Sequence, residues 1–278
     1  MLNYSGYYCN VFTDSYTVKE PKYIMLMSDL HLGAAATDEN KIRRELKKAV
    51  DIDARILING DLFDGILPKD MKRFTPSAVK SELQGKDALI NRTVEYVANF
   101  LEPYKTHIDM IGVGNHETAI LKHHSVDLVD LLLKQLDCEN IKFGGYTGFV
   151  VYRYSYNSND SSRTRTVCIF YNHGKGGSAP VTKGTIDFQR NSALVEGADI
   201  IWLGHNHQRN SVINVKVGYD RSGNVRFRNE HCVRTGSYMR FTEEMYAVNM
   251  GLSPLPHGGA LATININYDN TIKIEITQ

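Results

Sequence analysis

The stretch YIMLMSDLH, residues 23–31, decides the fold class, because it joins a strand-like run directly to residues that can bind a metal. The apolar run over 23–27 predicts a buried strand, and Asp29 and His31 follow it at once. Four other apolar runs end in the same kind of polar loop. These loops are Gly60-Asp61, Gly114-Asn115-His116, Asn172-His173-Gly174 and Gly204-His205-Asn206-His207.

Strands and helices alternate along the first half of the chain, which predicts a layered α/β fold. Further strands are expected at 55–59 and 107–113, and helices at 38–50, behind Thr37 as N-cap, and up to about residue 136. The later half is strand-rich, with hairpin turns expected near 157–162, 220–224 and 269–270. Residues 1–278 are expected to form a single domain, in which residues 65–105 are a helical insertion of unknown role.

The carboxyl ends of strands in such a fold face a common crevice, so the five polar loops can meet there although they are far apart in sequence. Five of the ten histidines lie in these loops. Glycines at 60, 114 and 204 allow sharp turns and close approach. The loops offer imidazole, carboxylate and amide groups without a thiolate, a mixture that suits Mn, Fe, Zn or Ni.

Composition excludes several other classes of protein. The 278 residues are 42% hydrophobic, enough for a sizeable core, and a net charge of +1 gives no general attraction to polyanions. The four cysteines are far apart and form no CxxC pair, which argues against a disulfide framework or a thiolate zinc site. The sequence shows neither a signal peptide nor a long apolar run, so we expect a cytoplasmic protein without membrane contact.

The ordered set D-x-H, GD, GNHE, a lone His before Gly, and GHxH resembles the five motifs of the calcineurin-like metallophosphoesterases. The resemblance spans residues 24–207. It implies a four-layer αββα sandwich, in which two mixed β-sheets are flanked by helices, and a centre with two divalent metal ions, manganese being favoured. It implies these roles: Asp29, His31 and His207 hold one ion, Asn115, His173 and His205 hold the other, and Asp61 bridges both.

The resemblance also implies the reaction. A hydroxide that bridges the ions would attack phosphorus in a phosphoester, and His116 would assist the leaving group. Asp64 is expected to orient His116 and to raise its pKa. Glu117 is expected to act only as a first-turn helix residue. Histidines outside the motifs, such as His257, are expected to be structural or to lie at the surface.

The residues of the motifs also bear on the class of substrate. Gly65 stands where the protein Ser/Thr phosphatases have the Arg of GDxxDRG, which grips a phosphomonoester, so that branch is disfavoured. The residues of the first two motifs are similar to those of the DNA-repair exonucleases. This resemblance favours a phosphodiesterase that acts on DNA. A phosphatase for small phosphomonoesters or nucleotides is the alternative, and a catalytically silent scaffold is a third reading. Protein partners cannot be inferred.

Basic residues that could contact a DNA backbone form only small local sets. These sets are Lys69-Lys72-Arg73, Arg163-Arg165 and Arg226-Arg228. Arg240 and Lys175 are further candidates for a phosphate contact, although a surface role is favoured for both.

Overall fold

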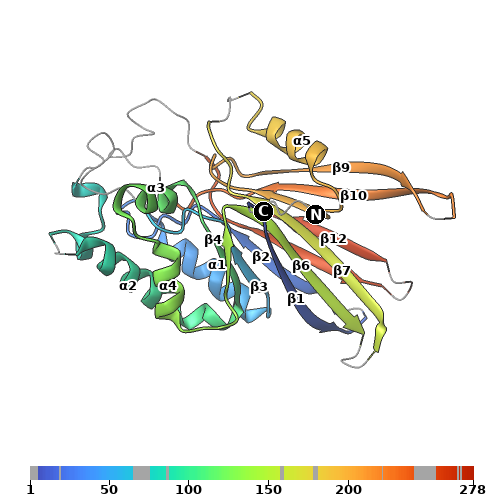
Figure 1. The fold of residues 1–278 in the computed structure, drawn as a ribbon, viewed down its shortest axis with the longest axis horizontal. Coiled ribbons are helices and arrows are strands. Elements are labelled where there is room, and N and C mark those ends of the chain that lie inside the picture. Colours follow the sequence, from blue (N-terminus) through green and yellow to red (C-terminus); the bar gives the residue numbers. More distant parts are fainter. Residues whose placement is uncertain are drawn as a thin grey trace.

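Two six-stranded sheets pack face to face and bring the ends of their strands to one edge of the molecule (Figure 1). The computed structural model describes residues 6–18, 20–64, 76–85, 88–156, 160–177, 181–220, 222–240, 255–267, 269 and 271–278. The two sheets, here called sheet A and sheet B, both mix parallel and antiparallel pairs. The predicted pair of mixed sheets is therefore confirmed.

Sheet B has the strand order β12-β11-β2-β3-β4-β5. Strands β2, β3, β4 and β5 run parallel to one another and end at one edge of the sheet. On the other side, β11 pairs antiparallel with β2, and β12 pairs antiparallel with β11. The strands are β2 (Lys22–Met27), β3 (Arg55–Ile58), β4 (Ile108–Gly112), β5 (Lys142–Gly145), β11 (Ala260–Ile266) and β12 (Ile272–Thr277). The apolar run of the opening motif is thus a strand inside the sheet, where both faces are covered.

Sheet A has the strand order β1-β6-β7-β8-β10-β9. Its strands are β1 (Tyr8–Tyr16), β6 (Thr147–Tyr156), β7 (Asp160–Asn172), β8 (Ile200–Leu203), β9 (Asn210–Tyr219) and β10 (Val225–Arg234). Strands β7, β8 and β10 run parallel, so the predicted loops after β7 and β8 leave the sheet at the same end. The three expected hairpins join β6 to β7, β9 to β10 and β11 to β12.

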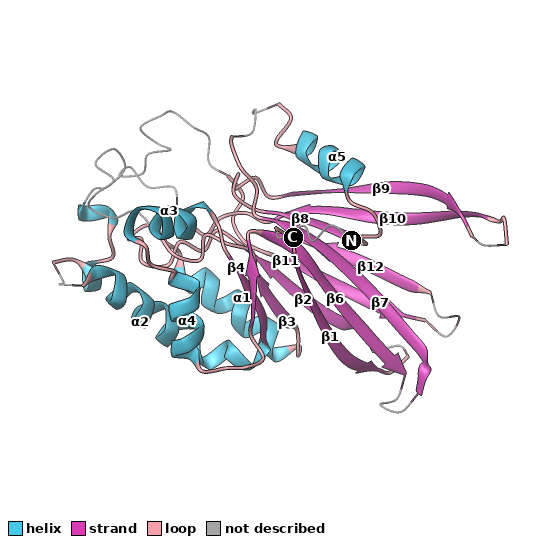
Figure 2. Cartoon of the chain, viewed as in Figure 1, coloured by secondary structure: helices cyan, strands magenta, loops and turns pink. Residues whose placement is uncertain are grey.

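Helices cover the outer face of each sheet and complete four layers (Figure 2). The helices are α1 (Glu39–Asp51), α2 (Leu89–Leu101), α3 (Asn115–His124) and α4 (Leu128–Leu136) on sheet B, and α5 (Thr185–Leu194) on sheet A. Between the sheets, Leu26 and Leu57 of sheet B pack with Ile169 and Trp202 of sheet A. In the part of the chain that the structure describes, no helix has the length and hydropathy that a membrane crossing needs.

Two helix boundaries differ from the prediction. The N-cap of α1 is Asp38, which accepts a hydrogen bond from the Lys41 N–H, so the predicted Thr37 cap was wrong. The helix expected to run to residue 136 is broken into α3 and α4, because Ser125 adopts a left-handed conformation (φ 57°) and Asp127 caps the next helix. Strand β1 was not predicted, and it gains its place by pairing with β6.

The predicted insertion over 65–105 lies partly outside the described residues, at 65–75 and 86–87. Its described part holds two short 3-10 turns, Pro76–Ala78 and Ser81–Leu83, helix α2, and the start of a third 3-10 helix, Glu102–His107. Val94, Val97 and Leu101 of α2 are buried in the core on the outer face of sheet B. This helix is therefore part of the layer that supports the site.

Candidate metal centre

The loops after β2, β3, β4, β7 and β8 converge, as their repetition in the sequence suggested. Three groups of side chains place their nitrogen and oxygen atoms within 4.8 Å of one another. The groups are Asp29-His31-His207, Asp61-His173-His205 and His31-Asp64-His116. All nine residues expected from the sequence, Asn115 included, belong to these groups or contact them.

The first group brings together donor atoms that could hold a cation. His31 Nε2 and His207 Nε2 lie 3.4 Å apart, and His207 Nε2 is 3.4 Å from Asp29 Oδ1. Asp29 and His31 are buried, His207 is partly exposed, and His31 Nδ1 has no hydrogen-bond partner among the described residues. Two ring nitrogens and a carboxylate held this closely fit a divalent ion with nitrogen and oxygen ligands.

The second group also brings ring nitrogens and side-chain oxygens close together. His173 Nε2 lies 3.2 Å from both Asp61 Oδ2 and Asn115 Oδ1, and His205 Nδ1 lies 2.6 Å from the same amide oxygen. The other nitrogen of His173 donates to the Asn59 carbonyl at 2.7 Å, so the neutral ring would present a lone pair at Nε2. Donation of a ring N–H to a backbone carbonyl orients a histidine for metal binding.

The electrostatics of the second group also favour positive charge. Burial lowers the pKa of His173, but the charge and hydrogen bond of Asp61 outweigh it and raise the pKa to about 10. Burial opposes ionisation of Asp61 as well, yet the neighbouring histidines hold the pKa of Asp61 well below its usual range. The carboxylate charge that stabilises this proton would also stabilise a metal ion, which binds the ring only after the proton leaves.

His116 and Asp64 lie beside these groups. His116 Nδ1 is 3.5 Å from Asp64 Oδ1, and the His116 N–H donates to Asp61 Oδ1 at 2.9 Å. Burial lowers the pKa of His116, but the Asp64 hydrogen bond and the nearby carboxylates raise it to about 9. Asp64 also lies 3.8 Å from His31 Nδ1, so it faces both imidazoles.

The loops can pack this tightly because of two glycines. A Cβ atom at Gly114 would lie 2.2 Å from Asp61 Oδ1, and one at Gly60 would lie 2.6 Å from His173 Nδ1. Backbone and ligand side chains therefore occupy the space that any larger residue would need. The close approach at Gly60 and Gly114 is therefore between the loops themselves.

Left-handed backbone conformations are concentrated in the same loops. Ten described residues other than glycine have a positive φ, and five of them belong to the candidate site. These five are Asp29 (55°), His31 (48°), Asp61 (47°), His205 (70°) and His207 (56°). Asp tolerates this region, whereas His does so less readily, so the surrounding structure must hold the loops in place.

A buried chain of hydrogen bonds orients Asp29. Trp202 Nε1 donates to Thr235 Oγ1 at 3.1 Å, the Thr235 and Ser28 hydroxyls lie 2.6 Å apart, and Ser28 Oγ donates to Asp29 Oδ2. The indole can only donate and the carboxylate can only accept, which fixes the direction of the chain. The His205 N–H donates to the same carboxylate at 3.1 Å, so Asp29 has little freedom to turn.

Sequence reasoning missed the role of Glu117. Its carboxylate is buried and accepts the backbone N–H groups of Asp61 (3.0 Å), Phe63 (2.9 Å) and Gly114 (2.7 Å). It therefore ties the loop after β3 to the start of α3. Burial and the Asp61 charge raise the pKa of Glu117, while the Phe63 and Gly114 donors lower it. The only sequence signal was an acidic residue next to Asn115-His116.

Glu117→Gln is expected to lower the free energy of unfolding by about 1–3 kcal/mol, because an amide NH₂ group cannot accept the N–H groups that the carboxylate accepts. Urea unfolding followed by circular dichroism measures this loss. Glu139→Gln is the matched control at an exposed glutamate. Equal stabilities of the two variants would contradict the tethering role.

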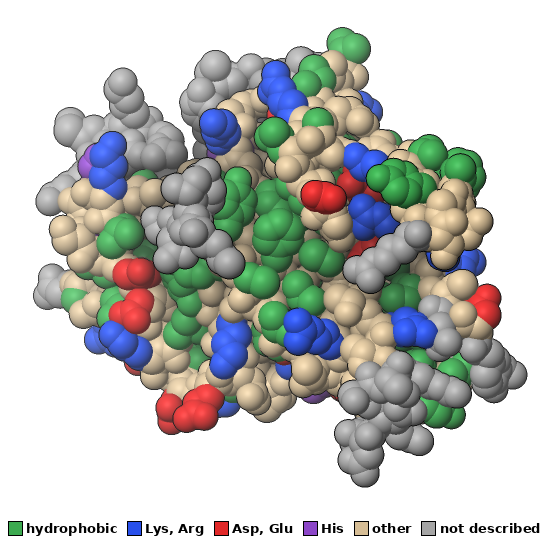
Figure 3. Space-filling view, turned by 45° about the vertical axis from the view of Figure 1, so that its right-hand side comes forward, with side chains coloured by type: hydrophobic (Ala, Val, Ile, Leu, Met, Phe, Trp, Pro, Cys, Tyr) green, Lys and Arg blue, Asp and Glu red, His purple; other side chains and the backbone are tan. Residues whose placement is uncertain are grey.

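The basic residues that were candidates for a phosphate or DNA contact lie in different surroundings. The guanidinium of Arg240 donates to the carbonyls of Ala35 and Thr37 at 3.4 Å, and Lys175 is exposed. Arg226 pairs with Asp220 and Arg228 pairs with Asp199, so both are engaged by carboxylates. The set Lys69-Lys72-Arg73 lies outside the described residues. On the face in Figure 3, Lys and Arg side chains stand apart, between hydrophobic and acidic ones.

Comparison with known proteins gave matches to solved structures. No family model and no curated protein matches the chain. Among solved structures, the calcineurin-like phosphoesterase YfkN from Bacillus subtilis has 13% identity and a TM-score of 0.41, with 93% of this chain and 90% of that chain covered. A conserved uncharacterized protein from Streptococcus pneumoniae, described as a predicted phosphoesterase, has 13% identity, a TM-score of 0.36 and the same coverage.

Chaetomium thermophilum Vps29 is also similar, with 11% identity, a TM-score of 0.33 and coverage of 93% of this chain and 96% of that chain. All three TM-scores are below 0.5. The function proposed below therefore rests on the residues and geometry of the site.

Proposed function

We propose that this protein is a phosphoester hydrolase that depends on two divalent metal ions. The observation that supports it most is the pair of adjacent donor groups, Asp29-His31-His207 and Asp61-His173-His205, with His116 beside them. Metal ions bound there would supply Lewis-acid activation of a phosphoryl group and of a water molecule. Manganese is the favoured ion, and Fe, Zn and Ni fit the same donors.

The protein's own residues have distinct tasks in this proposal. Asp29 and Asp61 hold negative charge where the ions bind, and the Asn59 carbonyl keeps Nε2 of His173 directed into the site. His116 donates a proton to the leaving-group oxygen, and Asp64 holds the ring in position. Cations bound nearby would oppose the raised pKa of His116 and bring it closer to neutrality, where a general acid works best.

The proposed substrates are phosphodiesters, and DNA is favoured because the residues of the first two motifs resemble those of the DNA-repair exonucleases. A small phosphomonoester or nucleotide is the second candidate. One structural observation supports this second candidate: Arg226 and Arg228, which could have contacted a DNA backbone, are already paired with carboxylates. DNA binding would then depend on fewer phosphate contacts.

A substrate panel tests the proposal. The protein loaded with Mn, Ni or Zn should be assayed on bis-p-nitrophenyl phosphate, p-nitrophenyl phosphate, cyclic nucleotides and linear DNA at low salt. Cleavage of the diester and of DNA is expected with Mn. Activity on monoesters alone would reject the nuclease assignment in favour of the second candidate. A protein without activity on any of these substrates, with any of these metals, would favour the catalytically silent scaffold. A His173→Ala preparation controls for contaminating enzymes.

A further inference from the structure

Strands β9 and β10 form a ribbon that extends past the rest of sheet A (Figure 1). β10 pairs with β9 along its full length, from Val225 to Arg234, but with β8 only from His231 onward. β9 is the last strand of the sheet, so its outer edge has no partner among the described strands. An unpaired edge of ten residues is long for a strand that stays solvent-exposed.

The two faces of the ribbon differ. One face lies under α5, where the Asn214 amide donates to Glu230 at 3.2 Å and Lys216 donates to the Ser192 carbonyl at 2.7 Å. The other face is apolar, and we call it the ribbon face. It carries six apolar side chains that are 58–83% exposed, Ile213, Val215, Val217, Tyr219, Val225 and Phe227, and one exposed polar side chain, Asn229, opposite Val215. Val217 opposes Phe227, and Tyr219 opposes Val225, so the six form one continuous surface.

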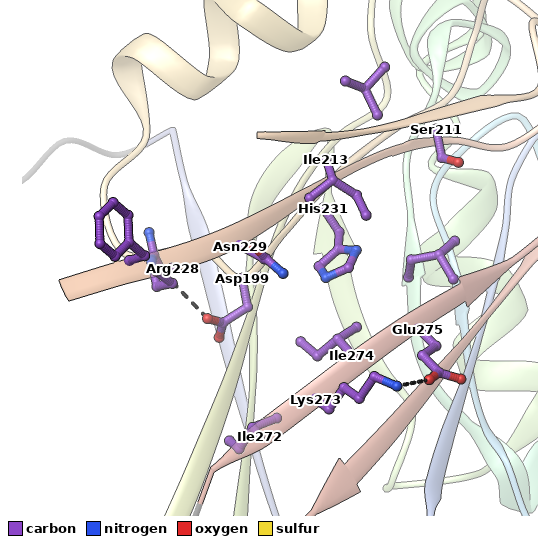
Figure 4. A pocket seen from close by; sticks show the side chains of 13 residues that line it. Asp199, Ser211, Ile213, Arg228, Asn229, His231, Ile272, Lys273, Ile274 and Glu275 are labelled. Carbon is purple, nitrogen blue, oxygen red and sulfur yellow. Dashed lines mark hydrogen bonds and ion pairs between the residues drawn. The ribbon is translucent and has the colours of Figure 1, made fainter. Parts of the chain in front are cut away.

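The ribbon face continues into a cleft of about 640 Å³ between the ribbon and β12. Figure 4 shows Ile213 and His231 on the ribbon side and Ile272 and Ile274 on the β12 side. The isoleucines of β12 are only partly buried. Apolar side chains therefore lie on both walls where the two sheets separate, together with the charged or polar side chains of Asp199, Arg228, His231, Lys273 and Glu275.

The size of the ribbon face is that of a protein interface. From their exposed fractions, the six side chains present about 800 Å², close to the area that each partner buries in a standard stable complex. A soluble monomer rarely exposes a continuous apolar surface of more than a few hundred Å². The ribbon face is thus expected to be covered in solution.

Charge favours a second copy of this chain as the cover. The net charge of +1 produces little repulsion between copies. Among the described residues near the ribbon face, Arg226 pairs with Asp220 and Arg228 pairs with Asp199, so covering the face leaves none of these four charges unpaired. Lys216, the only charged residue of β9, lies on the opposite face.

We propose that two copies of this chain form a dimer by packing their ribbon faces against each other about a two-fold axis. A two-fold axis places the same patch on both sides of the interface, so an apolar patch meets an apolar patch. The free edges of the two β9 strands lie next to this contact. The proposal concerns a surface distinct from the metal centre and does not depend on its chemistry.

The test is the mass of the protein in solution, measured by light scattering after size exclusion and by sedimentation equilibrium. At about 50 µM the wild type should have about twice the monomer mass of 31.4 kDa. Phe227→Lys should weaken the dimer at least about 100-fold and give a monomer. The matched control is Leu194→Lys, at another exposed apolar side chain (85% exposed), which should remain dimeric.

Phe227 is 72% exposed, so its replacement is not expected to unfold the chain. A circular dichroism melt verifies this, and Val217→Lys provides a second variant on the same face. A monomeric wild type at about 100 µM would reject the proposal. A dimer that both variants leave intact would reject it too, because the contact would then lie elsewhere.

Discussion

Replacement of Asp61 by alanine should remove bound metal and lower the hydrolysis rate at least about 10³-fold. Asp61 is buried, and its Oδ2 lies 3.2 Å from His173 while its Oδ1 accepts the His116 N–H at 2.9 Å. It therefore contacts both the second donor group and the residue proposed as general acid. Without its charge, a bound cation would lose the carboxylate that offsets it, and the second donor group would keep only imidazole and amide ligands.

Metal content by mass spectrometry and Mn titration calorimetry measure the first effect independently of activity. The wild type is expected to bind two ions, and Asp61→Ala at most one, with weaker affinity. Asp130→Ala is the matched control, since this aspartate is exposed and pairs only with Lys134 on its own helix. Two ions in Asp61→Ala, or a rate within tenfold of the wild type, would refute the assignment of Asp61.

His116→Ala should separate catalysis from metal binding. Asp29, His31, Asp61 and the other proposed ligands remain in this variant, so both ions should stay bound while turnover falls about 10²–10⁴-fold. The loss should depend on the leaving group. A nitrophenolate leaves without a proton, whereas an alkoxide needs one, so an alkyl ester should suffer far more than a nitrophenyl ester.

Two further variants sharpen the test of His116. Asp64→Asn should reduce the rate by a smaller factor, about tenfold, because the ring remains in the site but loses the charge that orients it and helps to raise its pKa. His123→Ala changes an exposed histidine on the same helix and should have no effect. An equal loss for alkyl and nitrophenyl esters would rule out proton donation by His116 as its role.

The strands and the convergence of their loops were predictable because their signals are local. An apolar run followed at once by Asp, Asn or His can be recognised within about ten residues, and the layered fold brings such ends together. The resemblance to the metallophosphoesterase motifs grouped Asp29 with His31 and His207, and the structure places these three side chains together. Their roles as ligands stay predictions until metal is measured.

The parts that were not predictable depend on contacts between distant residues. Glu117 gains its role by accepting N–H groups from a loop more than fifty positions earlier. Thr235 reaches Ser28 across 207 positions, and β1 becomes a strand only through its pairing with β6. The break between α3 and α4 arises from one left-handed residue, Ser125, which a hydrophobic pattern does not reveal.

The five left-handed residues of the site have a consequence for how this protein could evolve. Each such backbone costs about 1–2 kcal/mol for a residue with a side chain, and glycine would relieve that cost. Substitutions such as His31→Gly or His207→Gly would thus ease the loop while deleting a proposed ligand. Selection for heat resistance alone would favour the loss of these histidines. The proposed metal site and the stability of the loops thus place opposite demands on these two positions.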